Sequence, residues 1–207
     1  MFNLASAPFA HNRRQTQTLM LLVILACLPG FLAQTWFFGW GTLIQILLAL
    51  VTALGCEALV LRLRGRPVKP ALLDGSAALT AVLIGLSLPP LLPWWMLVLG
   101  TAFAIIIAKH LYGGLGQNLF NPAMVARVAL LVSFPLPLTT WVLPGVQASL
   151  PAPGFTESLC IVLGVTSIPD AMASASPLGY AKTELSRGID LLHSLTSGHA
   201  PAAAAWH

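Results

Sequence analysis

Long apolar runs dominate this 207-residue sequence and set the strongest limit on what it can fold into. Hydrophobic residues make up 57% of the chain and charged residues only 8%, whereas a soluble domain is about 25% charged. So few charges cannot cover a surface that faces water. We therefore exclude a soluble globular fold and expect an all-α integral membrane protein, because about 20 apolar residues cross a bilayer as one helix.

Five apolar runs are candidate transmembrane helices. They cover approximately residues 18–38, 41–61, 72–88, 94–108 and 122–143. The first run ends without a small-x-small cleavage site, so we expect a retained helix and not a signal peptide. After Pro144 the chain is richer in Pro, Gly, Ser and Ala, and the apolar stretch 159–165 is too short to span. We predict three parts: a cytoplasmic segment over 1–17, a transmembrane bundle of about five spans over 18–144, and an extracytoplasmic segment over 145–207.

The positions of the basic residues predict the orientation, because Lys and Arg near span ends mark the cytoplasmic side. Eight of the ten precede the first run, separate the second from the third, or bracket the loop between the fourth and fifth: Arg13, Arg14, Arg62, Arg64, Arg66, Lys69, Lys109 and Arg127. The opposite loops carry an aromatic belt of Trp36, Trp40, Trp94 and Trp95. The N-terminus is therefore predicted to be cytoplasmic, and residues after about 144 periplasmic. No basic run is dense enough to indicate nucleic acid as a partner.

Three ionisable residues lie within or beside the runs, where charge is expensive and marks candidate functional sites. Glu57 lies about one helical turn from Arg62 and Arg64, so a local ion pair or interfacial exposure competes with a functional role. Asp74 begins an Asp-Gly-Ser segment, where it can cap a helix or take part in an ion or proton path. Arg127 lies about one turn inside the fifth run and can snorkel to the surface.

A glycine-rich loop runs from Tyr112 to Pro122 and contains three glycines within four residues. Its three side-chain amides, on Gln117, Asn118 and Asn121, offer donors and acceptors without charge. Because glycine lets the backbone approach a ligand closely, the loop can hydrogen-bond a planar ring with polar edges. The alternative is a tight turn followed by a helix that Asn121 caps, with Pro122 at the first helical position.

Nothing in the sequence indicates that the chain is catalytic alone. Ser174 and Ser176 lie near Asp170, but no Gly-x-Ser-x-Gly elbow or positioned base accompanies them. Three cysteines without a CxxC spacing predict neither a disulfide framework nor a metal site. Redox chemistry would therefore have to belong to a bound cofactor.

Three segments resemble one known family. Ala7 to Thr16, Gln34 to Thr42, and Ala108 to Met124 resemble the D subunit of the Rnf electron-transport complex, a family related to the B subunit of the sodium-pumping NADH:quinone oxidoreductase. The similarity extends over about residues 2 to 187. The resemblance implies a multi-pass subunit of the bacterial inner membrane. Its complex would move electrons between ferredoxin and NAD, coupled to transport of Na⁺ or H⁺, and the other Rnf subunits would be its partners in the bilayer.

The resemblance also implies covalent FMN, which a flavin transferase attaches outside the cytoplasm. The family's motif has the form Asp-x-x-Ser-x-Ala-Thr-Pro, and on this sequence it begins at Asp170 and places the phosphoester on Ser176. The sequence departs from the motif, because the acceptor is usually Thr and Ala173 stands where the family has a small hydroxyl residue. Ser174 is the alternative acceptor. The orientation predicted from the charges puts this segment on the same outer side.

The sister family implies a second flavin, a non-covalent riboflavin near the cytoplasmic side, hydrogen-bonded by Asn118 and Asn121. Family members have roughly twice as many spans as this sequence, the second half repeating the first. The Ala-rich stretch from Gly188 to His207 does not resemble what should follow, so we expect a truncated or partial subunit. The alternatives are a non-redox membrane scaffold or inactive fragment, and a channel or transporter on the same spans.

Overall fold

The structure is a computed structural model, and it describes residues 16–114, 118, 120–142, 153–167 and 173–174. These residues are mostly helical, which confirms the expected all-α class. The elements are α1 (Thr16–Phe38), α2 (Gly41–Leu63), α3 (Val68–Leu73), α4 (Ser76–Ser87), α5 (Trp94–Phe103), the π-helix η1 (Ala104–Leu111), α6 (Pro122–Ser133), α7 (Pro135–Thr139), β1 (Trp141–Val142), α8 (Phe155–Val162) and β2 (Ala173–Ser174).

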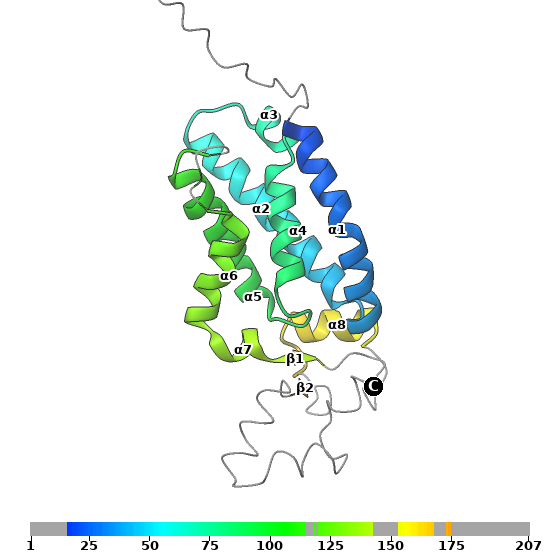
Figure 1. The fold of residues 1–207 in the computed structure, drawn as a ribbon. Helices are drawn as coiled ribbons and strands as arrows, with labels where there is room; N and C mark the ends of the chain where they lie inside the picture. Colours follow the sequence, from blue (N-terminus) through cyan, green and yellow to red (C-terminus); the bar gives the residue numbers. More distant parts are fainter. Residues whose placement is uncertain (1–15, 115–117, 119, 143–152, 168–172, 175–207) are drawn as a thin grey trace, which may run out of the picture.

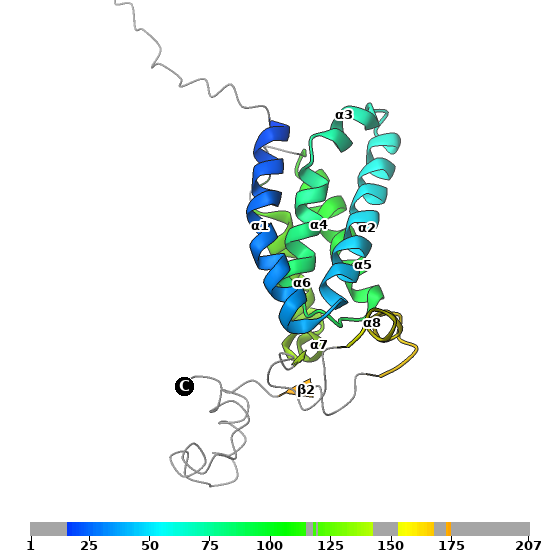
Figure 2. The same ribbon diagram turned by 90° about the vertical axis from the view of Figure 1, so that its right-hand side faces the viewer.

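Helix α4 lies in the middle of the bundle and packs against α1, α2 and α6 (Figure 1). The short helix α3 lies at the end where α1 begins and α2 finishes. At the opposite end, α8 runs across the bundle, nearly perpendicular to the long helices (Figures 1 and 2). The end with α3 also holds the exposed residues Arg62, Arg64, Arg66 and Lys69, and the other end holds Trp36, Trp40, Trp94 and Trp95. Which end faces the cytoplasm stays a prediction.

Three helices are long and apolar enough to cross a bilayer: α1, α2 and the continuous α5–η1 over Trp94–Leu111. The expected third and fifth spans are shorter than the sequence suggests, because α4 and α6 each have 12 residues. At about 1.5 Å per residue each is about 18 Å long, less than the roughly 30 Å of a hydrocarbon core.

Glycine and proline explain why these two runs are interrupted. Gly75 adopts a left-handed φ of 77° between α3 and α4, a conformation that glycine takes without strain. Phe134 precedes Pro135 and takes an extended φ of −135°, which ends α6. Non-helical backbone at membrane depth is tolerated where protein surrounds it.

Two glutamines supply donors to the irregular segment between α4 and α5. The carbonyl of Leu86 would normally accept from the N–H of residue 90, but Pro90 has none. Gln34 of α1 donates its amide Nε2 to that carbonyl instead, at 3.0 Å. Gln45 of α2 donates to the carbonyl of Leu92 at 2.6 Å and is fully buried. The helix break is therefore stabilised by side chains from two neighbouring helices.

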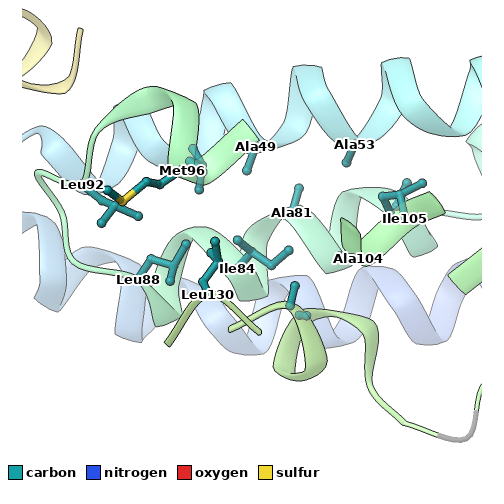
Figure 3. Packing of buried hydrophobic residues seen from close by; sticks show 14 of the residues in the cluster. Ala49, Ala53, Ala81, Ile84, Leu88, Leu92, Met96, Ala104, Ile105 and Leu130 are labelled. Carbon is teal, nitrogen blue, oxygen red and sulfur yellow. The ribbon is translucent and has the colours of Figure 1, made fainter. Parts of the chain in front are cut away.

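Small residues let α2 and α4 approach closely. Ala49 and Ala53 of α2 point toward Ala81 of α4, and all three are fully buried (Figure 3). A methyl group added to Gly85 would lie 2.6 Å from Cγ1 of Ile46. Because lipid tails are as apolar as leucine, close packing of small residues is a main source of stability between membrane helices.

Candidate functional site, a buried ion pair

The most unusual contact in the bundle joins Glu57 of α2 to Lys109 of η1. The ammonium Nζ of Lys109 donates to Oε1 of Glu57. The Lys109 side chain is only 2% exposed and the Glu57 side chain only 1%. The sequence predicts a local partner for Glu57, Arg62 or Arg64, or interfacial exposure. That prediction is wrong: both arginines are exposed, and Glu57 pairs with a residue 52 positions later.

A serine and a second carboxylate extend the network. Nζ of Lys109 also donates to Oγ of Ser76, at 2.7 Å. The Ser76 hydroxyl and its backbone N–H donate to Oδ1 of Asp74 at 2.6 and 2.8 Å. The N-cap of α4 is Gly75 and not the predicted Asp74, because Gly75 is the last residue before the helix. The Asp74 carboxylate instead accepts from the first backbone N–H of α4, one residue outside the usual capping position. The same carboxylate is also linked through Ser76 to the buried ammonium.

His110 follows Lys109 in the π-helix and faces the same carboxylate. Its Nε2 lies 3.6 Å from Oε1 of Glu57, and π-helical turns occur frequently at functional sites. Neither this Nε2 nor Oε2 of Glu57 has a hydrogen-bond partner among the described residues. Buried polar atoms without a partner are rare and call for a specific explanation, such as a bound water or ion. Within the described ranges, no three His, Cys, Asp or Glu side chains are grouped to bind a metal.

Lys109 is the functional candidate that sequence reasoning missed. The sequence assigns Lys109 to the cytoplasmic loop before Tyr112, but the structure buries it inside the bundle. Lys109 is therefore wrongly counted among the basic residues that mark the cytoplasmic surface. One signal was available. A carboxylate inside an apolar run, here Glu57, requires an opposite charge, and Lys109 directly continues another apolar run. Arg127, the third ionisable candidate, lies on the exposed side of α6.

The glycine-rich loop adjoins this network through Asn118. Its side-chain amide lies 3.0 Å from the carbonyl oxygens of both Lys109 and Gly114, and the amide nitrogen is assigned to this side because it can donate to them. Asn121 accepts from the N–H of Ala123 at 3.0 Å through Oδ1, which confirms the predicted helix cap. The loop is thus tied to the main chain of the residue that forms the ion pair.

An apolar cavity of about 180 Å³ lies beside the same loop. Its lining comes from η1, the end of α5, the loop and the start of α6: Phe103, Ile107, Ala108, Tyr112, Phe120 and Val125. Three of these side chains are aromatic. The cavity therefore offers apolar and aromatic surface, two of whose residues, Tyr112 and Phe120, come from the loop that also carries Asn118 and Asn121.

The predicted flavin-attachment residues Asp170 and Ser176 lie outside the described residues. Ser174, the alternative acceptor, is in β2 and pairs with Trp141 of β1 in an antiparallel register. The ring of Trp141 contacts Phe38 at the end of α1, with centroids 6.0 Å apart. β2, which contains Ser174, therefore lies at the end of the bundle with α7 and α8, opposite the end with α3 (Figures 1 and 2).

These features define a class: a multi-pass α-helical membrane protein with interrupted helices and a charge network buried between them. Residues 3–206 match the family described as NQR2, RnfD, RnfE, and the chain belongs to this family. The match is longer than the resemblance over residues 2 to 187 and includes most of the Ala-rich stretch.

Curated relatives agree with this assignment. The chain is 72% identical to the D subunit of the ion-translocating oxidoreductase complex of Aeromonas hydrophila, over 91% of this chain and 57% of that protein. The proteins of the same name from Aeromonas salmonicida and Escherichia fergusonii are 70% and 51% identical, again over 91% of this chain. The chain spans 56–57% of the length of these relatives.

Proposed function

We propose that this chain is the membrane part of an ion-translocating oxidoreductase subunit, which moves electrons between ferredoxin and NAD and couples them to Na⁺ or H⁺ transport. The observation that carries this proposal is the 72% identity to a protein named as the D subunit of such a complex. The buried Glu57–Lys109 pair supports it, since charges inside a membrane bundle commonly mark ion paths. Its partners are the other subunits of the complex, in the bacterial inner membrane.

Covalent FMN on Ser176 is the proposed electron carrier. When bound, FMN supplies the redox chemistry, and the protein supplies position and electrostatics. A serine hydroxyl offers the same oxygen nucleophile as the usual threonine. Ser176 can therefore form the same phosphoester to FMN. The β1–β2 pairing of Ser174 with Trp141 supports an attachment point at the end of the bundle opposite the ion pair.

A riboflavin beside Asn118 and Asn121 is the proposed second flavin. The aromatic side chains of Phe103, Tyr112 and Phe120 support it, because they line a cavity beside the loop that carries both amides. Its volume of about 180 Å³ is below the roughly 300–1,000 Å³ of ordinary ligand pockets, so the described lining can hold only part of a flavin. The main chain engages the Asn118 nitrogen and the Asn121 oxygen, which leaves the other amide atoms for the flavin.

Glu57 is the proposed station for the transported cation, with Asp74 beside it. A carboxylate that is 1% exposed and has one oxygen without a partner in the described structure can accept a proton or coordinate a sodium ion. A purely structural ion pair is the alternative, because buried pairs also occur where they only maintain packing.

In-gel flavin fluorescence tests the covalent cofactor. The chain is co-expressed with the flavin transferase as wild type, Ser176→Ala and Ser174→Ala, and is denatured so that only covalent flavin remains. We expect a fluorescent band for the wild type and for Ser174→Ala, and a dark band for Ser176→Ala. A dark wild-type band beside a bright full-length relative would instead favour a non-redox membrane scaffold.

A further inference from the structure

On the basis of this function, we propose that Lys109 is a switching counter-ion: its ammonium leaves Glu57 for Asp74, past Ser76, when a monovalent cation binds Glu57. The two carboxylates come from different elements, α2 and the turn between α3 and α4. Nζ of Lys109 already donates both to Glu57, where the movement would begin, and to Ser76, which lies on the way to Asp74.

The distances make the exchange short. Ser76 Oγ lies 2.7 Å from Nζ of Lys109 and 2.6 Å from Oδ1 of Asp74. The second carboxylate is therefore no more than two hydrogen-bond lengths from the ammonium. A lysine side chain has a flexible four-carbon stem and three rotatable donors, so it can cover this distance by a change of rotamer. Ser76 accepts from Lys109 and donates to Asp74, which keeps the route polar inside the bundle.

Charge balance supplies the reason for the exchange. A cation that bound Glu57 with Lys109 still in place would put two positive charges on one buried carboxylate, and like charges repel strongly in a low-dielectric interior. With Lys109 on Asp74, each carboxylate has one cation. Oε2 of Glu57 and Nε2 of His110, both without a partner among the described residues, are then available to the incoming cation.

The charged groups around Glu57 are few. Asp74 faces it from the α3–α4 turn, and Lys109 and His110 face it from η1. Arg64 follows α2 and is exposed. No other carboxylate among the described residues is hydrogen-bonded to this network, so Asp74 is the second station that the geometry offers.

Asp74 also accepts from the backbone N–H of Ser76 at the start of α4, and one substitution separates the two roles. Asparagine keeps a side-chain oxygen that can accept from this N–H, so Asp74→Asn keeps the contact while it removes the charge that would receive Lys109. A residue that only held the start of α4 would leave cation dependence unchanged in this variant. Asp74→Glu keeps the charge and should restore the switch.

The test uses the complete complex with the full-length subunit, reconstituted in liposomes. Redox-driven transport is titrated with Na⁺ at fixed pH and, in a second series, over a range of pH without Na⁺. We expect Asp74→Asn and Ser76→Ala to raise the half-saturating cation concentration about tenfold or more. Asp74→Glu should return the titration toward wild type, and Glu157→Gln on the exposed side of α8 is the matched control.

The two titration series identify the cation. They also distinguish a failure of the switch from a failure of the proposed function. A shift in the Na⁺ series indicates sodium, and a shift in the pH series indicates protons; either supports the switch. Unchanged titrations in Asp74→Asn and Ser76→Ala, beside a cation-dependent wild type, would overturn the switch and leave the proposed function standing. A wild-type complex without any cation dependence would overturn both.

Discussion

The ammonium of Lys109 and the carboxylate of Glu57 meet at the contact between η1 and α2, although 52 residues separate them in the sequence. Both side chains are almost fully buried. Neither charge can turn to water when its partner is removed. The pair therefore joins two helices through an interaction that is stable only as long as both members are present.

Removing one member of this pair should destabilise the protein more than removing both. We expect Lys109→Met to lower the free energy of unfolding by about 3–5 kcal/mol, because the buried Glu57 carboxylate is left without its partner. Glu57→Gln should cost less, because Lys109 can pair with Asp74 past Ser76. The double variant should lose much less than the sum of the two. Thermal unfolding in detergent measures this, with Glu157→Gln, at an exposed position, as the control. Additive losses would show that the two side chains are not coupled.

Local patterns in the sequence were sufficient for the fold class and for one helix cap. The apolar runs predicted an all-α membrane protein, and Asn121 caps α6 as its neighbouring residues suggest. The partner of Glu57 was not predictable in this way. Arg62 and Arg64 lie nearby in sequence, and only the packing of η1 against α2 brings Lys109 to it.

The lengths of α4 and α6 were missed for a related reason. A hydropathy run does not show where a left-handed glycine such as Gly75 or a residue before proline such as Phe134 stops the helix. Such breaks are tolerated because side chains from other helices satisfy the backbone. Gln34 does this for α4 from a position 52 residues away from its acceptor.

The contact between α2 and α4 predicts a sharp difference between two glycines. In Gly85→Ala the new methyl group would meet Ile46 at 2.6 Å from Cγ1 and 3.0 Å from Cα, and overpacking of this kind costs about 1–3 kcal/mol. Gly55→Ala is the matched control, since nothing lies within 4 Å of its added methyl group. It should be neutral or stabilising by up to about 1 kcal/mol. Melting temperatures of both variants in detergent measure the difference, and equal values would contradict the close approach.

Gln34 should contribute to stability because Pro90, which follows α4, has no N–H to donate. In Gln34→Leu the half-buried carbonyl of Leu86 loses the donor that replaces the missing N–H of Pro90. A fully buried acceptor without a partner costs about 1–3 kcal/mol, so we expect a loss of stability near the lower end of that range. Gln17→Leu, the same change at an exposed position of the same helix, should have little effect. Comparison of the two by thermal unfolding isolates the hydrogen bond. Equal stability of both variants would mean that the Leu86 carbonyl finds another partner.

Asn121 allows its capping role and its proposed flavin role to be separated. The side-chain oxygen accepts from the N–H of Ala123, so Asn121→Ala should lower stability by about 1 kcal/mol, the usual value for a lost N-cap. Asn121→Asp keeps this oxygen and should retain the stability, but it replaces the amide nitrogen that would donate to a flavin. We therefore expect the full-length complex with Asn121→Asp to unfold like wild type and to release less non-covalent riboflavin on denaturation. Normal riboflavin content in Asn121→Asp would limit Asn121 to the cap, because the amide nitrogen is the one atom that the substitution removes.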